Sequence, residues 1–381
     1  MFTTLLLASL PSLALASTPF SAAHKLFGYA EKNGPMPPAS SGELLVFNHS
    51  CATAPCVVTQ IHVPSIYPGR GCPWDWESGR LRVYVDGSAT PTLDLTLLQL
   101  ASVGAAGAQG NSHKDISPFS AGNLFGKNAQ TGGVWTTIRI PFGSTLRVTL
   151  QQALECNSQS TYWLIIRGVE GLQISLGEIE LPPTARLVQS VINATTFAPD
   201  AFIPLASAPS ANDGMLLYTF IDATSGDPNY LEGCFHITFG DGSTQFLSSG
   251  TEDYFLSACA LQQPLPPPFP RTHTFVPSPP PHPTHQRLLA FAAYFDEGTF
   301  AQAQAGYVYA GPGGSKSMYK LHDTRDLIPF HGGMQFVWRN NENGQSCPNH
   351  FSPAAPPARR ASATGPMTLT SVVFSYQWPA A

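Results

Sequence analysis

The stretch Arg82-Val83-Tyr84-Val85-Asp86-Gly87-Ser88 alternates along a short run and then turns at an Asp-Gly pair. A side-chain period of two predicts a β-strand with one buried face. Asp-Gly favours a hairpin because both central residues of a type I′ turn take positive φ. The stretch His236-Ile237-Thr238-Phe239-Gly240-Asp241-Gly242-Ser243 repeats the pattern further along the chain. Together they predict an all-β fold in two copies.

Short apolar alternations bounded by turn residues recur through the rest of the chain, and helical periodicity is scarce. About a dozen such strands predict two antiparallel sandwiches. We expect the first domain over residues 40–205 and the second over 212–381, joined by a linker at 207–214 that is rich in Ser, Ala and turn-formers. The predicted strands are 44–48, 57–63, 81–85, 136–140, 146–150, 162–166, 172–179, 216–221, 234–239, 304–309, 335–338 and 371–378.

The composition is typical of a secreted, loop-rich β protein. Only 11% of the 381 residues are charged, whereas Gly (33) and Pro (36) are abundant. A net charge of −5 without a basic run argues against a nucleic-acid partner. The apolar run 3–10 and the cleavage pattern Ala14-Leu15-Ala16 predict a signal peptide over residues 1–16, the alternative being a buried N-terminal strand. No later stretch approaches the ~20 apolar residues of a membrane span, so no membrane partner is expected.

The cysteines also fit an oxidising, secretory compartment. There are seven, and Cys51 and Cys56 are spaced to close a small loop, although the odd count leaves at least one thiol free or paired between chains. The sequons Asn48-His49-Ser50 and Asn193-Ala194-Thr195 agree with secretion. No Cys-x-x-Cys or His-x-x-x-His spacing indicates a structural zinc site, and we expect neither a metal nor another cofactor.

Two glutamates flank the second Asp-Gly turn. A two-residue turn at Asp241-Gly242 would place Glu232 opposite Thr251, and a one-residue bulge at Gly250 would move it opposite Glu252. Opposed residues of an antiparallel pair have Cβ atoms ~4.5–5.5 Å apart. Retaining glycosidases hold two carboxyl groups ~5–5.5 Å apart, one as nucleophile and one as acid. The alternative is a pair of exposed strand-end glutamates with salt partners.

The segments around these glutamates resemble glycoside hydrolase family 172, formerly domain of unknown function 2961. The most specific likeness lies in Tyr230-Leu231-Glu232-Gly233-Cys234, followed by Ser-Ser-Gly-Thr-Glu-Asp-Tyr-Phe at 248–255. The likeness spans about residues 40 to 378. Further stretches carry it in the same order, at 80–87, 125–127, 132–142, 317–323, 327–330 and 336–340.

This resemblance implies a double β-jelly-roll fold that assembles as homotrimers or as hexamers of trimers. It also implies retaining hydrolysis or transglycosylation of α-D-furanosides, such as D-arabinofuranosides or fructofuranosides in oligo- or polysaccharides. Carried over, Glu252 is the expected nucleophile and Glu232 the acid/base. The alternatives are a non-catalytic carbohydrate-binding jelly-roll protein, which has no need of two opposed glutamates, and a capsid-like structural assembly.

Four further residues are expected near this pair. Asp253 and Tyr254 adjoin the nucleophile, where they would orient its carboxylate, hold sugar hydroxyls or simply pack. His322 and Asp323 belong to a segment that resembles the family's and are expected to line the pocket, although a lone His is more often structural.

Trp74 and Trp76 form a loop cluster on which sugar rings would stack, although buried packing is commoner for Trp. The chain departs from the family in two places. Lys320 stands where the family usually has Arg, which keeps the charge but loses the two-pronged donor geometry. A Pro-rich insertion at 262–286 follows Glu252 and is either a lineage-specific loop or an unremoved intron.

Overall fold

The computed structural model describes residues 24–67, 69–70, 72, 79–100, 119–121, 124–127, 133–153, 156–226, 228–248, 250–256, 299–310, 314–323, 326–340 and 365–380. This part of the chain consists almost entirely of antiparallel β-sheets, which confirms the predicted all-β class. The predicted signal peptide, the Pro-rich insertion, Trp74 and Trp76 lie outside the described residues.

The first half of the molecule contains one seven-stranded and one four-stranded sheet. The larger sheet has the order β1-β11-β3-β8-β7-β6 with β9 beside β3, and the smaller has the order β2-β10-β4-β5. The strands are β1 (Lys25–Met36), β2 (Leu44–Ser50), β3 (Cys56–Tyr67), β4 (Arg80–Val85), β5 (Leu93–Thr96), β6 (Phe119–Ala121), β7 (Phe125–Lys127), β8 (Val134–Thr136), β9 (Ile140–Phe142), β10 (Thr145–Gln151) and β11 (Ser160–Glu170). A short hairpin, β12 (Ser175–Leu176) and β13 (Ile179–Glu180), follows.

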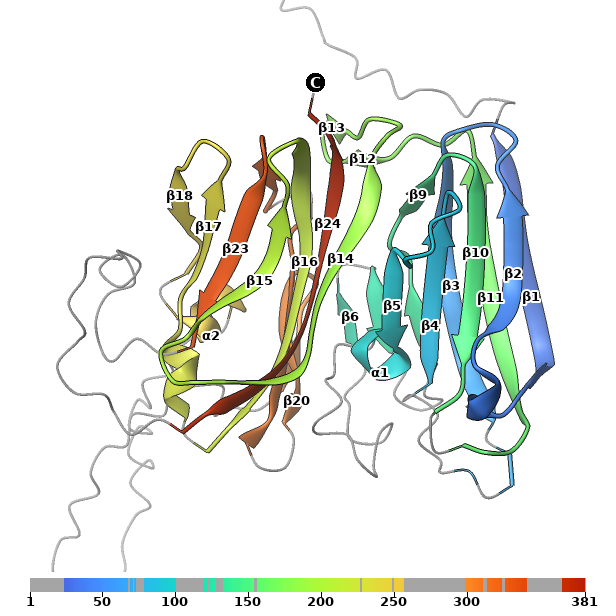
Figure 1. Ribbon diagram of the computed structural model, residues 1–381, viewed down its shortest axis with the longest axis horizontal. Helices are drawn as coiled ribbons and strands as arrows, with labels where there is room; N and C mark the ends of the chain where they lie inside the picture. The colour runs from blue at the N-terminus through green and yellow to red at the C-terminus, as the bar shows by residue number, and fades with distance from the viewer. Residues whose placement is uncertain are drawn as a thin grey trace, which may run out of the picture.

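The second half also contains one seven-stranded and one four-stranded sheet (Figure 1). The larger has the order β14-β24-β16-β21-β20-β19 with β22 beside β16, and the smaller has the order β15-β23-β17-β18. The strands are β14 (Arg186–Phe197), β15 (Phe202–Ala208), β16 (Asn212–Ser225), β17 (Phe235–Phe239), β18 (Thr244–Phe246), β19 (Phe300–Ala301), β20 (Ala305–Ala310), β21 (Lys316–Leu321), β22 (Ile328–Phe330), β23 (Met334–Arg339) and β24 (Met367–Pro379).

The two halves repeat one topology. Their strand orders become identical when β14 is matched to β1 and the later strands are matched in chain order, up to β24 and β11. The two stretches with Asp-Gly turns fall on the equivalent strands β4 and β17. Strands β9 and β22, which are also equivalent, both have the sequence Ile-Pro-Phe. The weak sequence echo therefore marks a repeated architecture.

The predicted linker at 207–214 is wrong. Ala208 ends β15, Asn212 begins β16, and the Asn212 N–H donates to the Pro209 carbonyl in the turn between them (2.9 Å). The chain instead passes from one half to the other at residues 181–185, so the predicted domain boundaries 40–205 and 212–381 are displaced. Ser, Ala and Pro favour a tight hairpin turn as readily as a linker, and composition did not distinguish them.

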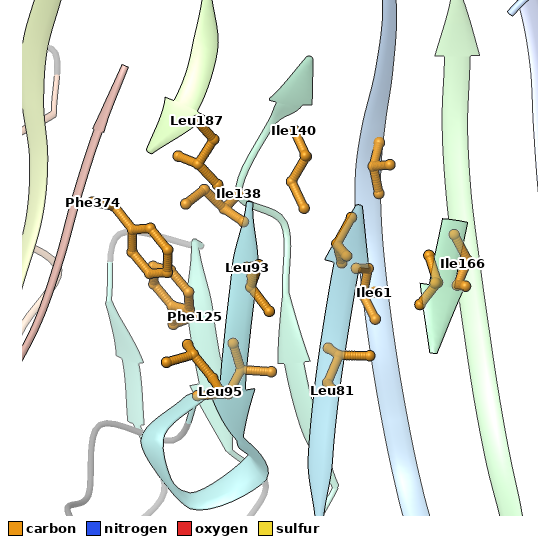
Figure 2. Packing of buried hydrophobic residues seen from close by; sticks show 14 of the residues in the cluster. Ile61, Leu81, Leu93, Leu95, Phe125, Ile138, Ile140, Ile166, Leu187 and Phe374 are labelled. Atoms are coloured by element: carbon orange, nitrogen blue, oxygen red, sulfur yellow. The ribbon is translucent and has the colours of Figure 1, made fainter. Parts of the chain in front are cut away.

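One hydrophobic core joins the two halves. The Phe125 ring from β7 lies 4.5 Å from the Tyr218 ring of β16, and Figure 2 shows Phe125 and Ile138 of the first half beside Leu187 and Phe374 of the second. Hydrogen bonds cross the same boundary: the Tyr376 hydroxyl donates to the Arg139 carbonyl (2.7 Å). A second core cluster lies wholly in the second half and includes Tyr254, Phe235 and Trp338.

The cysteines of the described residues are cross-linked. Cys51 pairs with Cys56, which confirms the predicted small loop, and Cys72 pairs with Cys156 across 84 residues of sequence. Cys234 is disulfide-bonded as well. Such bonds persist in oxidising compartments. Within the described residues, no helix is long and apolar enough to cross a membrane.

Candidate active site

The two glutamates lie on short helical turns. Glu232 ends the 3₁₀ helix η3 (Pro228–Glu232), and Glu252 is the second residue of α2 (Thr251–Tyr254), which packs against η3. The predicted strand register that opposed them is wrong. The turn between β17 and β18 has three residues, 240–242, with Gly242 at φ +81°, and pairing ends at His236 and Phe246. A type I turn followed by a left-handed Gly is the common three-residue hairpin loop.

The two family-like motifs meet against β23. The Thr251 hydroxyl donates to the Gly233 carbonyl (3.0 Å) and accepts from the Trp338 indole N–H (3.0 Å). The Arg339 N–H donates to the Cys234 carbonyl (3.0 Å). Gly233 is required here, because a Cβ on it would lie 1.8 Å from the Arg339 carbonyl oxygen. Leu-Glu-Gly-Cys and Gly-Thr-Glu-Asp-Tyr thus position their glutamates on neighbouring turns of one packed unit.

Glu252 is buried, with only 4% of its surface exposed, whereas Glu232 is half-buried. The Glu252 carboxylate folds back over Gly250, whose missing Cβ would lie 3.1 Å from Oε1. Burying a carboxylate costs free energy that a fold has no need to spend. A buried and a half-buried carboxyl group on neighbouring turns have the residue types of a nucleophile and an acid/base.

The first half builds the same turn without an acid. Helix α1 (Leu97–Leu100) follows β5 directly, and α2 follows β18 after residues 247–250. The Leu97 backbone N–H donates to the Gly79 carbonyl (3.0 Å), and the Thr251 hydroxyl donates to the Gly233 carbonyl. As the second residue of α1, Leu98 is the counterpart of Glu252, the second residue of α2. It is 3% exposed, so the repeated architecture closes this turn with a buried leucine.

The residues expected beside the pair have different surroundings. Asp253 is exposed on α2, and Asp323 is half-buried. Tyr254 is buried, its ring is stacked on Phe235 (4.0 Å between centroids), and its hydroxyl lies 3.0 Å from Thr219 Oγ1 and 2.7 Å from His322 Nε2. Burial raises the pKa of the Tyr254 hydroxyl, so it stays protonated. Tyr254 acts here as a packing and hydrogen-bonding residue.

His322 is buried behind Tyr254. Its Nδ1 lies 3.2 Å from Asp326 Oδ2, and the Lys320 ammonium lies 2.9 Å from the same oxygen. The contact with His322 and the Lys320 charge hold the pKa of Asp326 far below its usual range, while burial lowers the pKa of His322. The ion pair is therefore an ionised Asp326 with Lys320 and a neutral imidazole.

Sequence reasoning missed Thr219 and Asp326. Thr219 lies in an apolar strand, and no local signal separates it from an ordinary buried threonine. Asp326 stands four residues after His322, a spacing that offered a weak signal. Among the described residues, no group of three or more His, Cys, Asp or Glu side chains is placed to hold a metal ion.

Compared with known proteins, the chain matches no family model and no curated protein. Among solved structures it is similar to a chain from the structure titled "Life in the extremes: atomic structure of Sulfolobus Turreted Icosahedral Virus". The two chains share 8% identity with a TM-score of 0.34, over 93% of this chain and 90% of that one. A likeness of this size carries no argument about function.

Proposed function

We propose that the protein is a secreted, retaining glycoside hydrolase or transglycosidase that acts on α-D-furanosides, such as D-arabinofuranosides or fructofuranosides. Glu252 is the nucleophile and Glu232 the acid/base. The observation that carries the proposal is the burial of Glu252 at a place where the first half has Leu98. A buried acid that the architecture does not require is a mark of a functional site. The resemblance of the surrounding motifs supplies the substrate class.

The reaction has two steps. The Glu252 carboxylate attacks the anomeric carbon while protonated Glu232 gives its proton to the leaving oxygen, which forms a covalent glycosyl-enzyme. Glu232, now ionised, then takes a proton from water or from a sugar hydroxyl that attacks the anomeric carbon and releases Glu252. Water gives hydrolysis and a sugar gives transfer, both with retention.

The test uses para-nitrophenyl α-D-arabinofuranoside and difructose dianhydride as substrates. We expect wild type to turn over at least one of them, and Glu252→Gln and Glu232→Gln to lose about 10³-fold or more in kcat. Asp241→Asn is the matched control, because Asp241 is an exposed carboxylate in the nearby hairpin turn and Asn-Gly preserves that turn. Wild-type rates in both Gln variants would refute the assignment. Furanoside binding without turnover, unchanged by either substitution, would indicate the carbohydrate-binding alternative.

We also propose that the chain forms a homotrimer with head-to-tail contacts. Within the chain, β14 packs against β5 and β9. Lys25 of β1 pairs with Glu170 of β11, and Arg186 of β14 pairs with Gln377 of β24 at the equivalent place. Leu26 on β1 is therefore the counterpart of Leu187 on β14. Leu187 is 2% exposed at the contact between the halves, whereas Leu26 is 83% exposed. A second copy would cover Leu26 if it presented β18 and β22, the counterparts of β5 and β9.

Head-to-tail contacts of this kind close into a ring when the rotation permits. Light scattering after gel filtration tests the assembly: we expect a trimer mass for wild type and a monomer mass for Leu26→Asp. The control is Val191→Asp, an exposed apolar residue on β14. A wild-type monomer, or a Leu26→Asp trimer, would contradict the proposed contact.

A further inference from the structure

A line of buried polar side chains runs beneath α2. Thr219 of β16, Tyr254 of α2 and His322, which follows β21, are joined by hydrogen bonds of 3.0 and 2.7 Å. Asp326 continues the line to the surface: its side chain is 47% exposed and is paired with both His322 and Lys320. We call the set Thr219, Tyr254, His322 and Asp326 the polar line.

The donor and acceptor of each hydrogen bond in the polar line can be assigned by starting from Asp326. The ionised Asp326 carboxylate lies 3.2 Å from His322 Nδ1 and favours the proton on that nitrogen, although the contact is electrostatic and not an aligned hydrogen bond. His322 is neutral, so its Nε2 accepts, and the Tyr254 hydroxyl is its donor. Tyr254 then accepts from the Thr219 hydroxyl. The two hydrogen bonds therefore run from Thr219 through Tyr254 to His322.

Sheet register identifies the counterparts of these residues in the first half. In β16, Gly214 pairs with Phe330 of β22, and in β3, Cys56 pairs with Phe142 of β9, so Gly214 and Cys56 are counterparts. Each strand then has a bulge three residues later, at Leu217 and at Thr59. Two strand positions further on, Thr219 matches Ile61. On the neighbouring strand, Thr219 pairs with Lys320 as Ile61 pairs with Thr136.

The same comparison assigns the other two members. The Leu321 N–H donates to the Gln304 carbonyl (2.6 Å), and the Thr137 N–H donates to the Leu124 carbonyl in the same way (2.8 Å). The next residues along the chain therefore match, His322 with Ile138. Tyr254, the last residue of α2, matches Leu100, the last residue of α1. Figure 2 shows Ile61 and Ile138 within the apolar core.

The first half therefore packs Ile61, Leu100 and Ile138, each 1% exposed, where the second half has a threonine, a tyrosine and a histidine. The connection that supplies Asp326 is also longer: residues 321–327 separate Lys320 from Ile328, whereas only 137–139 separate Thr136 from Ile140. An apolar trio is sufficient for this architecture, so the polar line is an addition to it. Buried polar groups cost free energy unless they are bonded, which requires another reason for their presence.

The polar line ends on the turn that carries Glu252. Helix α2 has four residues and no side-chain hydrogen bond at its N-cap, so it has little stability of its own. It is held at its first residue by the bonds of Thr251 to Gly233 and Trp338, and at its last residue by Tyr254. Glu252 lies between these two anchors.

We propose that Tyr254 and His322 are positioning residues, which fix α2 through the polar line and so hold the Glu252 carboxylate in its reactive orientation. The inference rests on the proposed function for the role of Glu252. A shift of about 1 Å at a reacting group costs on the order of 100-fold in rate, which gives such a device its value.

The test compares two variants. Tyr254→Phe keeps the ring on Phe235 and removes the hydroxyl, which leaves Thr219 and His322 without their shared partner. The triple variant Thr219→Val, Tyr254→Phe, His322→Ile replaces the three buried members of the polar line by apolar groups, as in the first half. Replacing both partners of buried hydrogen bonds by apolar groups of similar shape is nearly neutral for stability.

Hydrogen–deuterium exchange is measured on peptides that cover α2, with α1 as the internal control, together with kcat, KM and the thermal midpoint. We expect amide exchange over α2 to rise about tenfold in Tyr254→Phe, with α1 unchanged. In the triple variant we expect a thermal midpoint close to wild type and kcat lowered about tenfold or more, with KM changed less than about threefold. A purely structural role would restore kcat together with stability.

The outcomes separate this proposal from the proposed function. Unchanged exchange over α2 in Tyr254→Phe overturns the positioning role, and so does a triple variant with wild-type kcat. If wild type turns over neither furanoside but exchange over α2 rises as expected, the proposed function fails and the anchoring of α2 by the polar line is supported.

Discussion

Helices α1 and α2 occupy equivalent places in the two halves, and they differ in what they bury. α1 places Leu97 and Leu100 in the apolar core and buries Leu98, whereas α2 places Glu252 beside Tyr254 and the polar line. Both follow the second strand of an equivalent hairpin and both contact the carbonyl of an equivalent glycine. The first half thus shows what this architecture needs, and the second half shows what has been added to it.

The largest expected effect comes from giving α2 the leucine that α1 has at the equivalent position. Glu252→Leu places the first half's residue on α2. We expect kcat on a furanoside to fall about 10⁴-fold or more, because the proposed nucleophile is lost. We expect the free energy of unfolding to stay equal or to rise by about 1 kcal/mol, because a buried carboxylate is replaced by an apolar side chain. Steady-state kinetics and urea unfolding measure the two effects, and a marked loss of stability would mean that the fold requires Glu252.

The reciprocal change, Leu98→Glu, places a carboxylate at the buried position of α1 that has a leucine. We expect a loss of stability on the order of 3 kcal/mol, because the new carboxylate is desolvated among apolar side chains. Catalysis below the lowered thermal midpoint should be unchanged. Urea unfolding of the two reciprocal variants side by side is the measurement, and equal stability effects at the two positions would show that α1 and α2 are not equivalent.

Substitution of Gly233 tests the close backbone contact between the residue that follows η3 and strand β23. A Cβ at residue 233 would lie 1.8 Å from the Arg339 carbonyl oxygen, so Gly233→Ala forces the backbone of η3 away from β23. We expect a loss of about 2–4 kcal/mol in stability and a loss of activity. Gly226→Ala is the control, because a Cβ on Gly226 meets nothing within 4 Å. Circular-dichroism melts would contradict the account if the two variants were equally stable.

The smallest expected effect is a change of stability at acidic pH, which depends on Asp326. The pKa of Asp326 is lowered in the folded state by the contact with His322 and by the Lys320 charge. A lowered pKa contributes stability that is fully present above the unfolded value of ~3.9 and is lost as pH falls through the folded value. The stability gap between wild type and Asp326→Asn should therefore be constant above about pH 5 and should narrow below pH 4. Because Asp326 is partly exposed, we expect a gap of about 1 kcal/mol or less.

The sequence predicted the β class and most central strands because alternation and Asp-Gly turns are local signals, as at Arg82–Ser88. It misplaced the boundary because a tight turn at 209–211 has the composition of a linker. It named Glu232 and Glu252 as a candidate pair from their motifs and gave them the wrong register, because turns as short as η3 and α2 carry no periodicity. The counterparts of Thr219 and His322 became visible only through strand pairing, which joins residues far apart in the chain.

The central claim is that Glu252 serves chemistry and not the fold. The most direct measurement is mass spectrometry of the protein after incubation with an activated 2-deoxy-2-fluoro-α-D-arabinofuranoside, which slows release of a covalent intermediate. The account predicts one sugar attached to Glu252 in wild type and in Asp241→Asn, and none in Glu252→Gln. An unlabelled wild type, or a sugar attached to another residue and retained in Glu252→Gln, would contradict it.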